Sequence, residues 1–174
     1  FLSFHTVHTP LQAKPEKIEK YKKRIAALGL SHKKEKDRRE KAFQNNAAYA
    51  AMVEHMDENV GRLLKRLDEL KLSDNTIVVW TSDNGGKGSV TSNLPLRGMQ
   101  KKLYEGGIRV PLIVRWPGRI AVGSRSAAPL ISNDFYPTLL DLAGCPQERR
   151  QHIDGVSFKD VLLGKRRSVG RKAI

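Results

Sequence analysis

The longest regular pattern of apolar positions in the chain lies in residues 42–70. Apolar side chains recur there at spacings of three and four, which is the period of one face of an α-helix. The pattern predicts one long amphipathic helix whose apolar stripe lies in the core, with Glu58 and Arg62 paired on the polar face. The members of the stripe are Tyr49, Met52, Val53, Met56, Val60, Leu63, Leu64, Leu67 and Leu70.

Two short apolar runs follow this helix and predict β-strands. Residues 76–81 read TIVVWT, a continuous β-branched run typical of a strand buried on both faces of a parallel sheet. Residues 110–116 predict a second strand, with Pro111 tolerated only near its start. The polar sequence SDNGG leaves the first strand at its carboxyl end. Open α/β sheets bind ligands at that edge, so we expect a site there.

Shorter elements are predicted at both ends of the chain. Residues 2–8 predict a short strand that stops at Thr9-Pro10, which places His8 at a strand end. Near the other end, Asn133 is expected to cap a helix that runs to Gly144, and residues 157–163 predict a last short helix. Together these elements indicate an α/β protein.

Composition limits the class of protein. The chain has 174 residues, 39% of them hydrophobic, which suits one packed domain over residues 1–174. No apolar run approaches the roughly 20 residues of a membrane helix, so no membrane span is expected. Cys145 is the only cysteine, which excludes an intrachain disulfide and a cysteine metal site. It follows a helix stop and is interpreted as structural.

The net charge of +14 and the isoelectric point near 10.1 favour polyanions as partners. Much of the charge lies in residues 14–41, where acidic residues are interspersed. We interpret this segment as a basic helical surface with solvated faces, because mixed-sign runs need no partner. Aromatic residues make up only 6% of the chain and form no row for stacking bases, so nucleic acid is not expected.

Asp83 and Asn84 are the first candidates for a functional site. A carboxylate and an amide oxygen at a sheet edge are hard donors that suit calcium. On spacing alone, Asp-Asn-Gly is more often a tight turn. A polar, glycine-rich stretch rather than a second strand follows it, which favours a site. Two ligands do not complete a calcium shell, which takes about six to eight oxygens.

Histidine and lysine supply the other candidates. His8 is either a site residue or a strand-end histidine bonded to backbone. His5, three residues earlier, is expected on the opposite face of an extended chain. Lys101 lies in a loop where glycines would let the backbone approach a ligand, and its ammonium could hold an oxyanion. An ordinary exposed basic loop explains this lysine equally well.

Several of these segments together resemble a known family. The runs YAAMVEHMDENVGRLLKRLDELKLSDNTIVVWTSDNGG, LPLRG, LYEGGIRVPLIVRWPG and DFYPTLLDLAG occur in this order. They resemble the sulfatases of the alkaline phosphatase superfamily over nearly the whole chain. The resemblance implies a three-layer α/β/α sandwich with a mostly parallel sheet, incomplete here at its N-terminal side.

The resemblance also implies an activity and a set of site residues. A sulfuric ester hydrolase of this kind uses one calcium ion and a formylglycine, with a sulfated small molecule or a sulfated glycan as substrate. Asp83 and Asn84 resemble its second pair of metal ligands. His8 resembles the histidine that contacts the sulfate or the ester oxygen. The first Asp pair and the C/S-x-P-x-R nucleophile motif would lie upstream, so we interpret the chain as an internal fragment that is inactive alone. Family resemblance favours the periplasm or the cell exterior.

One position departs from the family pattern. The sulfate-gripping lysine is expected four residues after Leu96, where this chain has Gln100, and Lys101 stands one place late. Gln100 can still donate a hydrogen bond, but without the charge that roughly doubles its strength. Either Lys101 bends inward or sulfate binding is weakened. The second possibility leaves open a degenerate module that binds sulfated polyanions without catalysis.

A phosphatase or phosphodiesterase of the same superfamily is the enzymatic alternative. Such an enzyme would more often place histidine after the aspartate, because imidazole nitrogen suits zinc. Asn84 in that place favours calcium and therefore a sulfatase.

Overall fold

The computed structural model describes residues 1–31, 41–146 and 153–171. The chain forms two compact units. One comprises Phe1–Lys71 and Val79–Ile113, and the other comprises Leu72–Val78 and Val114–Ile174. Within the described ranges, every helix is too short or too polar to cross a membrane. The expectation of one domain over residues 1–174 stays a prediction.

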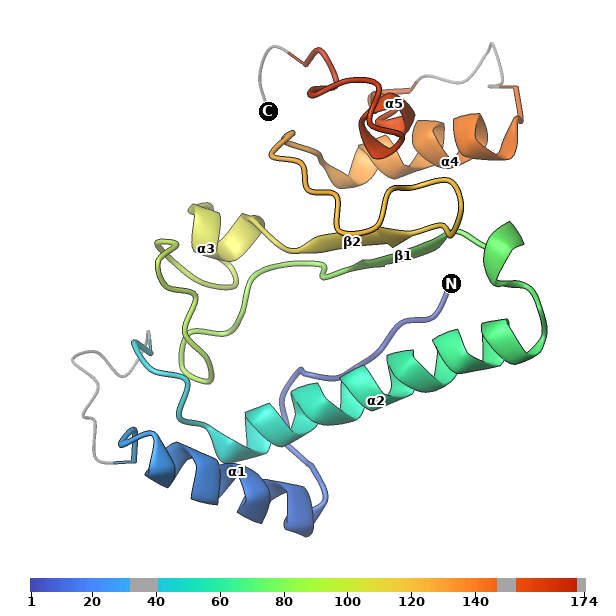
Figure 1. Ribbon diagram of the computed structural model, residues 1–174. Helices are drawn as coiled ribbons and strands as arrows, with labels where there is room; N and C mark the ends of the chain where they lie inside the picture. Colours follow the sequence, from blue (N-terminus) through green and yellow to red (C-terminus); the bar gives the residue numbers. More distant parts are fainter. Residues whose placement is uncertain (32–40, 147–152, 172–174) are drawn as a thin grey trace. The chain divides into compact units, whose positions relative to one another are not determined.

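Two helices of the first unit pack side by side (Figure 1). Helix α1 (Pro15–Ala27) lies in the basic segment, whose residues 32–40 are outside the described ranges. Helix α2 (Ala47–Glu69) confirms the predicted long helix, and the side chain of Asn46 caps its first turn. Its apolar stripe is only partly buried, because Met52 is 5% exposed whereas Leu63 is 38% exposed.

Ion pairs join the two helices. Lys17 Nζ lies 2.9 Å from Glu54 Oε1 and also contacts Glu58, while Lys20 Nζ lies 2.8 Å from the same Glu54 oxygen. Hydrogen bonds from Lys20 and Lys17 lower the pKa of Glu54 to about 2. This contribution to stability is present above the ordinary carboxyl pKa and is lost as the pH falls toward 2.

The predicted pair between Glu58 and Arg62 is wrong. Glu58 is taken by Lys17 from the neighbouring helix, and the guanidinium of Arg62 donates instead to Asn59 Oδ1 at 3.2 Å. The spacing along one helix gave no indication of a competing cation on a second helix.

Two strands are described and they pair in a two-stranded sheet. Strand β1 (Val78–Thr81) follows a single 3₁₀ turn, η1 (Ser73–Asn75), and strand β2 (Leu112–Arg115) follows Pro111. Both strands were predicted. Burial on both faces was predicted only for residues 76–81 and is incomplete, because Val79 is 36% exposed.

Hydrogen bonds at the strand ends show that β1 and β2 run in opposite directions. The hydroxyl of Thr81, at the end of β1, donates to the carbonyl of Pro111, just before β2, at 3.0 Å. The indole of Trp116, just after β2, donates to the carbonyl of Asp74, before β1, at 3.1 Å. The prediction of parallel strands is therefore wrong for this pair, and the three-layer sandwich stays a prediction. The antiparallel arrangement brings the loop after β1 beside the loop before β2.

The second unit contains the C-terminal helices. A 3₁₀ turn, η2 (Ser132–Asp134), leads into α4 (Phe135–Ala143), and α5 (Lys159–Leu162) follows. Helix α4 ends as predicted, because Gly144 adopts the left-handed conformation with φ of 69°. The predicted cap by Asn133 is wrong, since the 3₁₀ turn occupies the start of the helix.

A buried carboxylate organises this unit. Asp134 is fully buried and accepts hydrogen bonds from the backbone N–H groups of Ile131 at 2.9 Å and Val156 at 2.8 Å. The guanidinium of Arg171 also contacts it. Burial opposes ionisation, but Arg171 and the two N–H groups outweigh it and lower the pKa of Asp134. One side chain thus joins three separate segments of the unit.

We predict that Asp134→Asn destabilises the protein strongly. The substitution leaves the half-buried Arg171 cation without its counter-charge, and removing one partner of a buried pair costs about 3–5 kcal/mol. Urea unfolding measures the decrease in the free energy of unfolding. Asp160→Asn is the matched control, because Asp160 pairs with Arg166 at 3.5 Å but is 43% exposed. Equal losses in the two variants would contradict the role given to Asp134.

Candidate functional site

The loop after β1 carries the two predicted metal ligands. Asp83 is exposed and Asn84 is half-buried. The backbone N–H of Asn84 donates to Asp83 Oδ1 at 3.0 Å and its side-chain amide donates to Asp83 Oδ2 at 2.6 Å. Ser82 Oγ donates to the carbonyl of Asn84 at 2.9 Å. These bonds fix a short turn that presents carboxylate oxygens at the surface.

These oxygens fit a hard cation. Because the amide nitrogen of Asn84 is directed to Asp83, its amide oxygen remains available as an acceptor. Carboxylate and amide oxygens are the donors that calcium takes. In the described ranges, no three His, Cys, Asp or Glu side chains gather into a metal-binding group. Asp83 and Asn84 would therefore supply part of a shell.

The loop before β2 carries Gln100 and Lys101. Gln100 is half-buried, whereas Lys101 is exposed and has a positive φ of 69°. Few residues other than glycine adopt this conformation. The turn closes where the N–H of Lys102 donates to the carbonyl of Met99 at 2.9 Å. The loop then enters the short helix α3 (Glu105–Ile108).

Backbone hydrogen bonds join these two loops. The N–H of Gly85 donates to the carbonyl of Gly107 at 2.9 Å, and the N–H of Gln100 donates to the carbonyl of Gly86 at 3.1 Å. The loops approach so closely that a Cβ on Gly85 would lie 1.9 Å from the carbonyl oxygen of Gly106. The sequence predicted that glycines here admit a ligand. In the structure they admit the neighbouring backbone.

Asn93 is a positioning residue that the sequence analysis missed. Its side-chain oxygen accepts the N–H of Gly86 and its side-chain nitrogen donates to the carbonyl of Gly86, both at 2.9 Å. The paired bonds hold the end of the loop after β1. The only signal in the sequence is an asparagine within a polar stretch, which by itself predicts a turn.

His8 lies in a turn and not at the end of a strand. Residues 2–8 form no strand, and the N–H of His8 donates to the carbonyl of His5 at 2.9 Å. The turn brings the two imidazole rings within 5.3 Å, centroid to centroid, in an edge-on arrangement. The prediction that they face opposite ways is wrong, because it assumed an extended chain. A turn places residues i and i+3 together.

The imidazole of His8 has one nitrogen engaged. Its Nδ1 lies 2.7 Å from the carbonyl oxygen of Thr9, so Nδ1 carries hydrogen and donates. The ring is exposed, and Nε2 is the nitrogen available for proton exchange. The hydroxyl of Thr9 lies 3.4 Å from Lys87 Nζ, in the segment that follows Asp83 and Asn84. His8 facing the same hollow as Asp83 stays a prediction.

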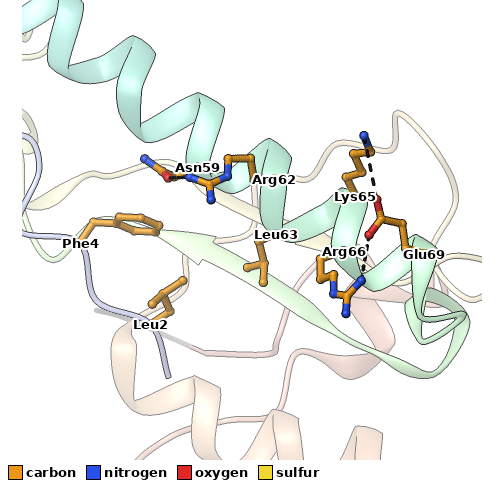
Figure 2. A pocket seen from close by; sticks show the side chains of 8 residues that line it. All are labelled: Leu2, Phe4, Asn59, Arg62, Leu63, Lys65, Arg66 and Glu69. Carbon is orange, nitrogen blue, oxygen red and sulfur yellow. Dashed lines mark hydrogen bonds and ion pairs between the residues drawn. The ribbon is translucent and has the colours of Figure 1, made fainter. Parts of the chain in front are cut away.

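A separate hollow of about 620 Å³ lies along α2. Figure 2 shows Leu2, Phe4 and Leu63 on its apolar side, with Lys65 and Arg66 both directed to Glu69. None of the candidate residues lines this hollow. The candidate residues therefore lie outside this hollow.

Comparison with known proteins identifies the family. The family model described as Sulfatase matches residues 1–145. The chain belongs to the sulfatase family. A curated sulfatase of Formosa agariphila is 37% identical over 173 residues, covering 93% of this chain and 29% of the relative. Steryl-sulfatase of Rattus norvegicus is also 37% identical, covering 94% of this chain and 26% of the relative.

A solved structure agrees with this assignment. The crystal structure of Ps i-CgsB is 34% identical, with a TM-score of 0.72, and the match covers 93% of this sulfatase chain and 32% of that chain. These neighbours support the α/β class. The chain spans less than a third of the length of each of these relatives.

We predict that Gly85→Ala separates the loop after β1 from the loop before β2. The added methyl group would meet backbone that cannot move away cheaply, and such overpacking costs about 1–3 kcal/mol. Thermal unfolding measures the decrease in stability. Gly61→Ala is the matched control, because a Cβ at Gly61 in α2 meets nothing within 4 Å and alanine favours a helix. A stable Gly85→Ala variant would contradict the close approach of the loops.

Proposed function

We propose that the protein carrying this chain hydrolyses sulfate esters, using residues of the two joined loops. The observation that carries the proposal is the pair of backbone bonds between them, Gly85 to Gly107 and Gln100 to Gly86. They keep the candidate metal ligands beside the candidate sulfate-contacting residues. Membership of the sulfatase family supports the reaction class.

In this proposal Asp83 and Asn84 hold part of the shell of one calcium ion. The carboxylate supplies charge and the amide supplies a neutral oxygen, in keeping with the donors calcium takes. Calcium, when bound, supplies a Lewis acid for the sulfuryl oxygens, and formylglycine supplies the nucleophile. The turn through Ser82 keeps the oxygens presented before any ligand arrives, because its bonds are internal to the loop.

His8 is proposed to handle the proton of the departing alcohol. Because Nδ1 donates to the carbonyl of Thr9, the ring exchanges its proton through Nε2 alone. A protonated ring can donate from Nε2 to the ester oxygen as the sulfur–oxygen bond breaks. Nε2 then accepts a proton to restore the starting form.

Gln100 and Lys101 are proposed to bind the sulfate group. The Gln100 amide can donate a neutral hydrogen bond, while the exposed Lys101 ammonium can supply a charge. The substrate is proposed to be a sulfated small molecule or a sulfated glycan. Support for the former comes from the 32% identical structure of BT4656 in complex with D-glucosamine-2-N,6-O-disulfate, with a TM-score of 0.59. Support for a glycan comes from the 34% identical crystal structure of Ps i-CgsB in complex with k-i-k-neocarrahexaose, with a TM-score of 0.71. The proposal includes a location in the periplasm or outside the cell.

We predict that Asp83→Ala in the full-length protein weakens calcium binding and lowers kcat/KM for an aryl sulfate by more than about 100-fold, because a charged ligand is lost. Calorimetry with calcium and initial-rate kinetics measure both effects. Asp57→Ala removes an exposed carboxylate from α2 and is the control. Full calcium affinity in the Asp83 variant would refute the assignment of this ligand.

We also predict that Gln100→Lys lowers the KM for an aryl sulfate by about fivefold. The new ammonium supplies a charge-assisted hydrogen bond, and the gain over a neutral one is about 1 kcal/mol. The backbone bond to Gly86 does not involve the changed side chain. Kinetics identical to those of the natural protein would show that Lys101 already supplies the charge. Absence of turnover in both proteins would favour the non-catalytic polyanion-binding module.

A further inference from the structure

The base of the loop before β2 is closed by an arginine and a tyrosine. The guanidinium carbon of Arg97 lies 4.0 Å from the centroid of the Tyr104 ring. The carbonyl of Arg97 also accepts the N–H of Gly106 at 2.7 Å. The two ends of the loop are therefore joined by a side-chain stack and by a backbone hydrogen bond.

The position of the tyrosine is further constrained by Gly98. This residue has φ of +86°, and a Cβ built on it would lie 2.9 Å from the Cβ of Tyr104. Any other residue at this position would meet the stem of the tyrosine. The side chain of Tyr104 is thus held between the backbone at Gly98 and the guanidinium of Arg97.

The tip of the same loop is fixed to the loop after β1. The N–H of Gln100 donates to the carbonyl of Gly86, which also accepts from Asn93. Lys101 follows at once in the left-handed conformation. A non-glycine residue keeps this conformation only where the surrounding structure determines it. The stack at the base of the loop and the backbone bond at its tip together hold Lys101 in this conformation.

We propose that the stack of Arg97 on Tyr104 is a clamp that positions Gln100 and Lys101 for the sulfate group. Arg97 and Tyr104 act through the loop and need not touch the substrate. The inference rests on the proposed function, because it takes Gln100 and Lys101 as the sulfate-contacting residues. It adds two positioning residues, outside the set predicted from the sequence.

The size of the effect follows from the kind of contact. A cation over an exposed aromatic ring contributes an amount equivalent to about a two- to fivefold change in an equilibrium constant. Tyr104 is 48% exposed, so we expect the stack to change the folding equilibrium by about twofold, the lower end of this range. Loosening the clamp is expected to act mainly on binding of the sulfate group.

The test uses the full-length protein with the variants Arg97→Met, Tyr104→Leu, the double variant and Tyr104→Phe. Two measurements are made on each: KM and kcat with an aryl sulfate, including inhibition by inorganic sulfate, and hydrogen exchange of the backbone amides in residues 97–107. Arg119→Met is the matched control. Arg119 also lies over an aromatic ring, that of Trp116 at 5.8 Å, but in the other compact unit.

We expect Arg97→Met and Tyr104→Leu each to raise KM and the inhibition constant of inorganic sulfate by about two- to fivefold, with a smaller change in kcat. The double variant should match the single ones, because each change already opens the clamp. Exchange at Gln100 and Gly106 should accelerate in all three. Tyr104→Phe, which keeps the ring, and Arg119→Met should resemble the natural protein.

Other outcomes overturn the clamp. Additive effects of the two changes, or an effect of Arg97→Met alone, would show that Arg97 contacts the substrate directly. Unchanged exchange in the single variants would show that the stack holds nothing. If the natural protein hydrolyses neither an aryl sulfate nor a sulfated glycan, the proposed function fails, while the exchange measurement still decides whether the clamp exists.

Discussion

The antiparallel pairing of β1 with β2 is the constraint on which the candidate site depends. In an antiparallel pair the end of one strand lies beside the beginning of the other. The bond between Thr81 and Pro111 marks this end of the pair. Chain leaving β1 through Asp83 and Asn84 therefore meets chain entering β2 through Gln100 and Lys101. In a parallel pair the two loops would lie at opposite ends of the strands.

The sequence predicted the long helix and both observed strands, but it did not predict how the strands pair. Helix α2, both strands and the stop at Gly144 follow from local patterns, namely apolar period, β-branched runs and a glycine that adopts positive φ. Strand direction is not encoded locally. The apolar run in β1 indicated burial, and burial suggested a parallel sheet. Val79 in β1 is 36% exposed, so the burial inferred from the apolar run is incomplete in this chain.

The candidate residues were found from residue type and motif, whereas the groups that hold them were not. Asp83 and Asn84 follow β1 as predicted. Gly106 and Gly107 were expected to let the backbone approach a ligand, yet each makes room for other backbone of the same loop. His5 was placed away from His8 because the chain was taken as extended. In each case the error arose where a contact depends on residues distant in sequence or on a turn, neither of which a linear pattern determines.

In the loop before β2, different groups determine the position of the backbone and the charge of the side chains. The backbone of the loop before β2 is held through the N–H of Gln100 and the carbonyl of Gly86, and neither group changes when the side chain of residue 100 is replaced. A chain with glutamine where the family pattern has lysine can therefore keep the loop in place. Glutamine lacks the positive charge of lysine. A hydrogen bond from a charged donor to sulfate is about twice as strong as one from a neutral donor. Since Lys101 is the next residue and already has an unusual backbone conformation, the loop retains a cation one position along from a fixed anchor. The backbone bonds therefore determine the position of the loop, and the side chains at residues 100 and 101 determine its charge. A substitution can change the charge without changing the position.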